Sequence, residues 1–211
     1  MMIWALFNDI AQRIITLDKW EQRSNLSIRL KKIQLPPGSK ALDFGCGTGL
    51  FARVFKKEGL RYWGYDVDNR LITFASRLYP DYSFTTSRDV LEDEGPFDLV
   101  LANCCFHHID DTLLSIELRR IKSLLADQGT FFLIDLILVE NDASFLHRTF
   151  MKLEQGEHVR TVGDYHKHVE RHFSVIRTQV ERSHIFSFNN RLNPLYNDLA
   201  VIECRKDGGR F

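Results

Sequence analysis

An α/β fold built on a parallel sheet is predicted by three features of this 211-residue sequence. Short apolar runs alternate with helix-like patterns from about residue 40 to residue 139, which is typical of a doubly wound sheet with helices on both faces. A glycine cluster follows the first of these runs and precedes a helix, as in open sheets that bind ligands at their carboxyl edge. Hydrophobic residues make up 44% and charged residues 27%, which is ordinary for a globular chain and excludes a disordered one.

The first 36 residues are predicted to form a helical arm. Apolar residues recur there with a spacing of 4-3-4-3, as on one face of a helix. They are Ile3, Phe7, Ile10, Ile14 and Leu17. A less regular apolar pattern continues to Ile33, and Pro36-Pro37-Gly38 then breaks the chain. We expect the arm to pack on the core with a solvated outer side, and a membrane-bound or partner-bound helix is the alternative.

Five strands and three helices are expected between residues 41 and 139. The strands are predicted at 41–44, 62–65, 82–86, 97–102 and 131–139. The helices are predicted at 50–57, from a cap at Asp68 or Asn69 to about residue 78, and from a cap at Asp110 or Asp111 to about residue 125. Gly129 is expected to end the last helix in a left-handed conformation.

The carboxyl-terminal third has a weaker pattern. Residues 140–172 are expected to be mainly helical and polar, and apolar segments at 173–180 and 199–202 predict two more strands. The final stretch around Gly208-Gly209 is expected to fray.

Charge and cysteine usage exclude several classes of protein. Lys and Arg total 28, as do Asp and Glu, so no basic excess favours binding to nucleic acid. The opening apolar run, Met1 to Phe7, is too short for a membrane helix and lacks signal-peptide features, which favours a cytoplasmic protein without stable membrane insertion. The four cysteines show neither a disulfide framework nor a paired zinc spacing. No metal site is predicted.

The glycine cluster and a later acid point to a nucleoside-bearing cofactor. Gly45, Gly47 and Gly49 let the chain turn tightly and let a ligand lie against the backbone. Asp66 lies 17 residues beyond Gly49 at the predicted end of the second strand, where its carboxylate can accept both hydroxyls of a ribose. Nicotinamide and flavin folds use GxGxxG, whereas this chain has GxGxG preceded by Asp43, which would repel a pyrophosphate and can hold a cationic amino group.

Residues 43–49 (DFGCGTG) resemble the first motif of the class I S-adenosylmethionine-dependent methyltransferases. The similarity extends from about Pro37 to Leu138 and includes segments 96–103, 106–110 and 118–125 with the following Gly129-Thr130-Phe131. The resemblance implies a Rossmann-like sheet of seven mostly parallel strands with an antiparallel edge hairpin. It further implies a single methyltransferase domain over 1–211, with an arm at 1–36, a cofactor-binding core at 37–138, a helical insertion or lid at 139–172 and the hairpin at 173–205.

The same resemblance implies roles for nine residues in binding S-adenosylmethionine. The methionine part would be held by Gly45, Cys46 and Gly47, with Asp43 near its amino group and Asn103 on the same side. Asp66 would bind the ribose, and Val67, Asp89 and Val90 would bind the adenine, with Asp89 accepting from the amino group. A simple turn at Arg88-Asp89 is the alternative. The chain departs from the family at Asp127-Gln128-Gly129, where a Pro-Gly-Gly turn is usual, and at Cys104-Cys105.

Catalytic and substrate-binding candidates follow the fourth predicted strand. His107 and His108 are candidates for a general base, since the sulfonium methyl is already activated and only a hydroxyl nucleophile needs help. A structural role for both is the alternative. In the insertion, His147, Arg148, Arg160 and Tyr165 are candidates for a polar or anionic substrate group. His168 and His172 could share a helix face, but no carboxylate completes a metal motif with them.

The sequence therefore predicts a methyltransferase that acts on a small-molecule acceptor by in-line displacement. A nucleic-acid or protein methyltransferase is an alternative, although residues 103–106 (NCCF) lack the prolines of the Asn-Pro-Pro-Phe/Tyr motif. A non-catalytic protein that binds S-adenosylmethionine is a second alternative, and a nicotinamide oxidoreductase a more distant one. Nothing in the sequence predicts an oligomeric state.

Overall fold

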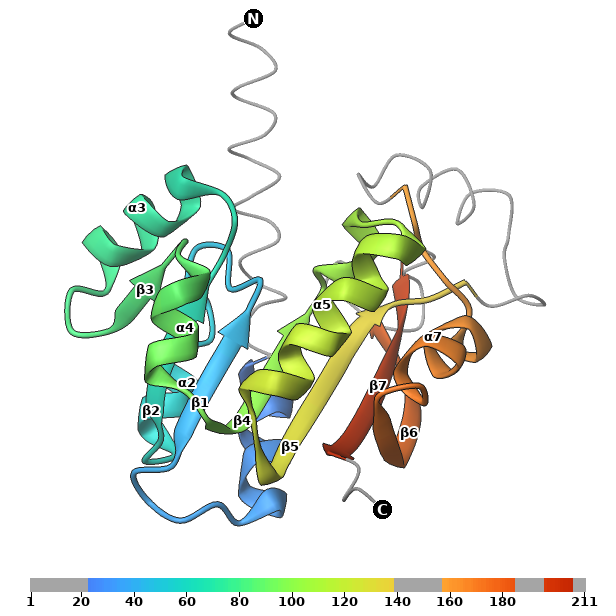
Figure 1. The fold of residues 1–211 in the computed structure, drawn as a ribbon, viewed down its shortest axis with the longest axis horizontal. Helices are drawn as coiled ribbons and strands as arrows, with labels where there is room; N and C mark the ends of the chain where they lie inside the picture. Colours follow the sequence, from blue (N-terminus) through green and yellow to red (C-terminus); the bar gives the residue numbers. More distant parts are fainter. Residues whose placement is uncertain (1–22, 139–156, 185–195, 207–211) are drawn as a thin grey trace, which may run out of the picture.

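The computed structural model describes residues 23–138, 157–184 and 196–206. Within them, seven strands form one sheet in the order β3-β2-β1-β4-β5-β7-β6 (Figure 1). The strands are β1 (Lys40–Phe44), β2 (Arg61–Tyr65), β3 (Ser83–Thr85), β4 (Phe97–Asn103), β5 (Leu125–Leu136), β6 (Phe173–His184) and β7 (Tyr196–Lys206). β1 to β5 pair in parallel, while β7 pairs antiparallel with both β5 and β6. The predicted fold class, including the antiparallel edge hairpin, is confirmed.

The helices lie on both faces of this sheet. They are α2 (Ala52–Lys57), α3 (Asn69–Leu78), α4 (Arg88–Glu94), the short 3-10 helix η1 (Phe106–His108), α5 (Asp111–Leu124) and α7 (Val162–Val169). A further helix covers residues 23–33. The apolar face predicted for residues 3–17 lies outside the described residues.

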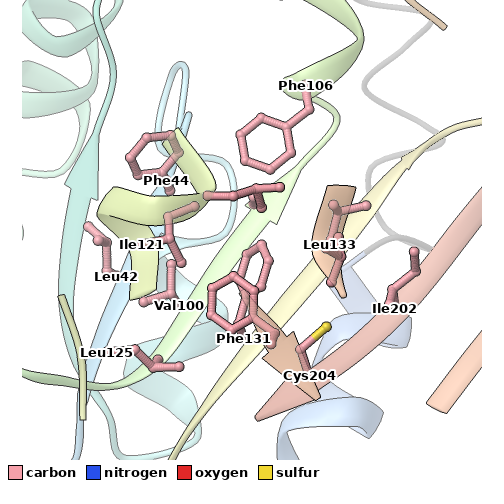
Figure 2. Packing of buried hydrophobic residues seen from close by; sticks show 14 of the residues in the cluster. Leu42, Phe44, Val100, Phe106, Ile121, Leu125, Phe131, Leu133, Ile202 and Cys204 are labelled. Atoms are coloured by element: carbon pink, nitrogen blue, oxygen red, sulfur yellow. The ribbon is translucent and has the colours of Figure 1, made fainter. Parts of the chain in front are cut away.

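Two apolar clusters hold the layers together. On one face, called the front face below, buried side chains of α4, α5 and α7 pack against β1, β4, β5 and β7. Figure 2 shows the part of this cluster that includes Ile121 of α5, Val100 of β4 and Phe131 of β5. On the rear face, Leu26 and Leu30 of helix 23–33 join α2 against β4, β5 and β7. Strands buried on both sides account for the continuous apolar runs of the sequence.

Hydrogen bonds decide between the alternative helix caps. Asp68 caps α3, since its carboxylate accepts from the Arg70 N–H at 2.8 Å. Asp110 caps α5, since its Oδ1 accepts from the Leu113 N–H at 2.8 Å. The sequence pattern did not predict α4, which follows a cap at Ser87. Its single fully buried position, Leu91, gives no apolar periodicity over seven residues.

The role predicted for Gly129 is wrong. Helix α5 already ends at Leu124, and Leu125 is extended and pairs with Phe97 as the first residue of β5. The next pair joins Leu99 to Thr130, so the residues between Leu125 and Thr130 loop out of the ladder. A Cβ on Gly129 would lie 2.7 Å from the Leu125 side chain. Close packing within this bulge, and not a left-handed cap, therefore requires the glycine.

Strands β6 and β7 are longer than the apolar segments that predicted them. Their ladder begins with Phe173 opposite Lys206 and ends with His184 opposite Tyr196. Polar residues on the exposed side extend it beyond the apolar segments. Of the helical region predicted at 140–172, α7 is present at Val162–Val169, and residues 139–156 lie outside the described part. No helix among the described residues combines the length and apolar character needed to cross a bilayer.

Candidate functional site

A turn at the carboxyl end of β1 occupies the point where the strand order reverses between β2 and β4. The Gly45 and Cys46 N–H groups both donate to the Tyr65 carbonyl, at 2.8 and 2.9 Å, which bends the turn across the end of β2. Gly45 has φ +77°, and a Cβ there would lie 2.6 Å from the Cβ of Cys105. Glycine is required for both reasons, and the two predicted segments, 43–49 and 103–106, pack against each other.

Asp66 is fixed at the edge of this turn. Its Oδ2 accepts from the Gly47 N–H and its Oδ1 from the Asp68 N–H, both at 2.9 Å. Each carboxylate oxygen can accept a second hydrogen bond. The side chain is only partly buried, so the two oxygens can receive a pair of hydroxyl groups from a ligand.

A cavity of about 230 Å³ lies beside Asp66 on the front face. Its lining brings together four of the predicted site residues, which are Gly45, Asp66, Val67 and His108. Most of the lining is apolar, with Phe44, Phe106 and Leu113 among the contributors. Val67 is 76% exposed, so its side chain is available to pack against a ligand. The cavity has the character of a pocket for a planar, largely apolar group beside a hydroxyl-binding carboxylate.

Asp89 and Val90 do not line this cavity. Both occupy the first turn of α4 with exposed side chains. Arg88 lines the cavity instead, where its Nε donates to the Tyr65 hydroxyl at 3.0 Å and its Nη2 to Glu117 at 2.7 Å. The sequence pattern missed this ion pair, because Arg88 and Glu117 are 29 positions apart and meet only through the packing of α4 on α5.

Asp43 lies beneath the glycine turn and is 1% exposed. The Tyr62 hydroxyl donates to its Oδ2 at 3.0 Å. The pKa of Asp43 is raised from 3.8 to about 7, chiefly by burial. The hydrogen bond from Tyr62 opposes this shift, and the negative charge of Asp66 adds to it. Cys46, also buried, has its thiol pKa raised chiefly by burial. A carboxylate held this way is stabilised in its charged form by any cation that approaches the turn.

Asn103 is the last residue of β4, and Cys104 follows it. They line a second cavity of about 40 Å³, together with residues of helix 23–33 and of β6. Cys104 has φ +51°, a left-handed conformation that costs free energy for a residue other than glycine. Its N–H donates to the Ile134 carbonyl at 2.8 Å, so the ladder with β5 continues through the strained residue.

His107 forms a buried pair with Asp135 of β5. The imidazole Nδ1 lies 2.5 Å from Asp135 Oδ1, and the side chains are 8% and 1% exposed. The Phe106 and His107 N–H groups donate to Asp135 Oδ2 at 2.7 and 3.2 Å. The carboxylate therefore fixes both the ring and the loop that carries it. The neighbouring His108 is exposed, and its ring centroid lies 4.0 Å from that of His107.

Arg160 binds the loop after β4 and does not line the cavity of about 230 Å³. Its guanidinium donates to the carbonyls of Phe106, Ile109 and His158 and to the carboxylate of Asp111, at distances between 2.7 and 3.0 Å. The residue is 6% exposed, so little of it can reach a substrate.

The other three candidates for substrate binding are Tyr165, His147 and Arg148. Tyr165 is completely buried in the front cluster, and burial raises the pKa of its hydroxyl far above the usual value. His147 and Arg148 lie outside the described residues. Among the residues that the structure describes, no three His, Cys, Asp or Glu side chains gather as a metal site.

Comparison with known proteins places the chain in a family. A family model described as "Methyltransferase domain" matches residues 18–186. The ubiquinone biosynthesis O-methyltransferase of Xanthomonas campestris pv. campestris (strain B100) is 33% identical over 104 residues, which are 46% of this chain and 43% of that protein. The ribosomal protein L11 methyltransferase of Ralstonia pickettii (strain 12J) is 41% identical over 71 residues, 32% of this chain and 24% of that protein. The chain thus matches less than half the length of either relative.

A solved structure shares the fold over nearly the whole chain. The TehB-like SAM-dependent methyltransferase from Corynebacterium glutamicum ATCC 13032 superposes with a TM-score of 0.62 and 20% sequence identity. The superposition covers 96% of this chain and 98% of that one. At 20% identity, this similarity shows a shared fold only.

Proposed function

The chain belongs to the class I S-adenosylmethionine-dependent methyltransferases, and on that premise we propose that it transfers a methyl group to a small-molecule acceptor. The observation that carries this proposal is the pairing of the glycine turn with Asp66 at the mouth of the 230 Å³ cavity. A carboxylate tied to the turn on one side and open on the other suits the two hydroxyls of a ribose. The apolar lining beside Val67 suits an adenine ring.

Residues along this edge of the sheet would hold the separate parts of the cofactor. Asp66 would hold the ribose, while Val67 and Leu113 would pack beside the adenine. The backbone of Gly45, Cys46 and Gly47 would hold the methionine part, with Asp43 below it as the balancing negative charge. Asn103 would lie on the rear side of the same edge. Asp89 and Val90 stay candidates for the rim of the adenine site, since their helix turn adjoins Arg88.

Methyl transfer depends more on the alignment of the acceptor with the methyl group than on general acid–base catalysis. S-adenosylmethionine supplies a methyl group on a positively charged sulfur, which a nucleophile takes in an in-line displacement. The protein contributes by holding the acceptor in line with that methyl group and by excluding water from the apolar crevice. Much of the rate can arise from these two effects alone.

An oxygen nucleophile would still benefit from a proton acceptor. His107 donates from Nδ1 to Asp135 in the arrangement that the short contact favours, which leaves Nε2 as the acceptor nitrogen. Asp135 would then stabilise the imidazolium that forms. His108 is the second candidate, and it lines the cavity proposed for the adenosine.

Isothermal titration with S-adenosylhomocysteine and with NAD tests the cofactor assignment. We expect micromolar binding of S-adenosylhomocysteine and none of NAD, and preference for NAD would overturn the proposal. An assay of S-adenosylhomocysteine release across pools of metabolites then tests transfer to a small molecule.

A protein acceptor is the second candidate function. It is favoured by the similarity to the ribosomal protein methyltransferase, which covers 71 residues. Release of S-adenosylhomocysteine with fractionated proteins but not with metabolites would select it. Tight binding without release from either pool would indicate a protein that binds S-adenosylmethionine without turnover.

A further inference from the structure

A trench runs along the rear face of the sheet between helix 23–33 and strand β6. Its upper chamber is the cavity of about 40 Å³ at Asn103 and Cys104, and its lower chamber is a cavity of about 180 Å³ at Lys32 and Arg177. Arg29 lines both chambers, so they adjoin. All the lining belongs to described residues. The trench begins at the strand end where the proposed methionine site lies and leads away from the adenosine cavity.

Alternating residues of β5 and β7 give the trench a continuous apolar floor. Ile134 and Leu199 line the upper chamber, and Phe132 and Val201 line the lower one. Residues two apart in a strand share a face, and the register pairs Ile134 with Val201. The floor is therefore an apolar strip that passes from the upper chamber into the lower one, where it ends at Glu203, the β7 partner of Phe132.

An ion pair joins the two walls. Arg29 extends from helix 23–33 and contacts the carboxylate of Glu181 on β6. The Arg29 side chain is 14% exposed, so it lies largely within the trench. Arg29 lines both chambers, whereas Glu181 lines only the upper one.

The trench carries a positive charge in a chain with no net charge. Its lining includes four cationic residues, Arg29, Lys32, Arg177 and Arg182, and two anionic ones, Glu181 and Glu203, which gives 4 − 2 = +2. Arg29 pairs with Glu181, and Arg182 pairs with the buried Asp198 at 3.0 Å. Lys32 and Arg177 are both exposed and form no ion pair with another described residue. Glu203 also lines the lower chamber and lies opposite Arg177 in the register. Apart from Arg29, which pairs with Glu181, the lower chamber therefore has two cations and one anion, 2 − 1 = +1, and this excess favours an external anion.

The length of the trench limits what can bind there. Asn103 pairs with Ile134 on β5, and Phe132 lies two residues back along that strand. At a rise of about 3.3 Å per residue, the two levels are separated by roughly 7 Å. This is the length of one aromatic ring that carries a short acid chain.

We propose that the trench binds the methyl acceptor, and that the acceptor is an elongated small molecule with an apolar body and a terminal carboxylate. Its nucleophile lies beside Asn103, its body crosses the apolar strip and its carboxylate lies between Lys32 and Arg177. The identification of this ligand as the acceptor rests on the proposed function, whereas the preference for an anion rests on the trench alone.

The test compares two probes that differ in one charge. The full chain, saturated with S-adenosylhomocysteine, is titrated calorimetrically with 3,4-dihydroxycinnamate and with its uncharged amide. We expect the carboxylate to bind more than tenfold tighter than the amide. The double variant Lys32→Ala/Arg177→Ala should lose this preference, and Arg119→Ala, which removes an exposed cation of α5 on the opposite face, should keep it.

A second measurement does not depend on the folding of a variant. In the wild-type chain, a rise in salt from about 50 to about 500 mM shortens the Debye length from about 14 to about 4 Å. Because exposed charges are then screened, binding of the carboxylate should weaken severalfold, whereas the affinity for the amide should stay unchanged. Equal affinities for acid and amide, no binding of the acid at millimolar concentration, or a preference that survives in the double variant would overturn the proposal. Binding of S-adenosylhomocysteine is read separately, and its failure would remove the proposed function while leaving the preference for the acid to be measured.

Discussion

His107 and Asp135 bring the ends of β4 and β5 together through one short contact, 2.5 Å between Nδ1 and Oδ1. The same carboxylate accepts from three backbone N–H groups, those of Phe106, His107 and Leu136. The pair therefore joins two neighbouring strands at the edge where the cofactor is proposed to lie, and it orients an imidazole there with little exposure to solvent.

Replacing Asp135 tests whether this pair moves a proton. With an oxygen nucleophile, Asp135→Asn should lower kcat by roughly 10²-fold or more, because an amide cannot stabilise an imidazolium as a carboxylate does. It should also remove the limb of the pH–rate profile that reports the base. S-adenosylhomocysteine affinity, measured by titration, should change little. An unaltered pH profile would assign the pair to structure alone.

Asp66 and Asp89 offer a matched pair of carboxylates. Asp66→Ala should weaken S-adenosylhomocysteine binding more than tenfold, because the ribose hydroxyls lose both acceptors and the glycine turn loses its contact at Gly47. Asp89→Ala, at an exposed position in α4, should weaken it less. Calorimetric dissociation constants for both variants decide the matter, and an unchanged constant for Asp66→Ala would remove that residue from the site.

Asp43 should make the cofactor-free protein less stable as pH rises. An acid whose pKa increases on folding, here from 3.8 to about 7, holds its proton more tightly in the folded state. Its contribution to stability is complete below pH 3.8 and is lost as pH rises toward 7. Asp43→Asn should therefore increase the free energy of unfolding at pH 8 by about 2 to 4 kcal/mol.

Urea unfolding of wild type and Asp43→Asn at pH 4, 6 and 8 measures this difference (pH values chosen to span the interval from 3.8 to about 7). The difference between the two proteins should grow from pH 4 to pH 8. A constant difference would show that Asp43 titrates in its ordinary range.

Substitution of two glycines in the turn distinguishes the cost of backbone strain from the cost of steric overlap. Gly47→Ala places its Cβ in open space and should cost only the left-handed conformation, about 1 kcal/mol. Gly45→Ala adds a contact of 2.6 Å with Cys105 and should cost about 3 kcal/mol in thermal or urea unfolding. Equal losses would mean that Cys105 moves aside freely.

Arg160 should behave as a structural residue. Arg160→Ala leaves the Phe106 and Ile109 carbonyls without their donors and should lower the free energy of unfolding by about 3 kcal/mol. The matched control is Arg171→Ala, at an exposed turn, which should change stability by less than about 0.5 kcal/mol. Loss of acceptor binding without loss of stability would return Arg160 to the substrate site.

Local patterns in the sequence determined the order of the elements and the position of the glycine turn. A buried parallel strand needs a continuous apolar run, and a tight turn with positive φ needs glycine, so both leave a signature within a few residues. Asp66 could be found for the same reason, since it comes directly after the second apolar run. For each of the caps at Asp68 and Asp110 the sequence left two candidates, because Asp and Asn side chains can both accept the capping hydrogen bond and the two candidates are adjacent.

Only the tertiary structure decided which polar side chains meet. Asp135 is 28 positions from His107, and Arg160 is 49 positions from Asp111, so neither contact has a local pattern. From the sequence, Arg160 and Tyr165 were candidates for binding a substrate. In the structure, Tyr165 is buried in the front cluster, and Arg160 is buried against the loop after β4, whose carbonyls accept its hydrogen bonds. Gly129 was likewise predicted to end helix α5, because glycine is common after helix ends. Its actual place in β5 depends on the register with β4, which is not a local property of the sequence. Local preferences set the backbone path, and long-range packing sets the environment of each charge.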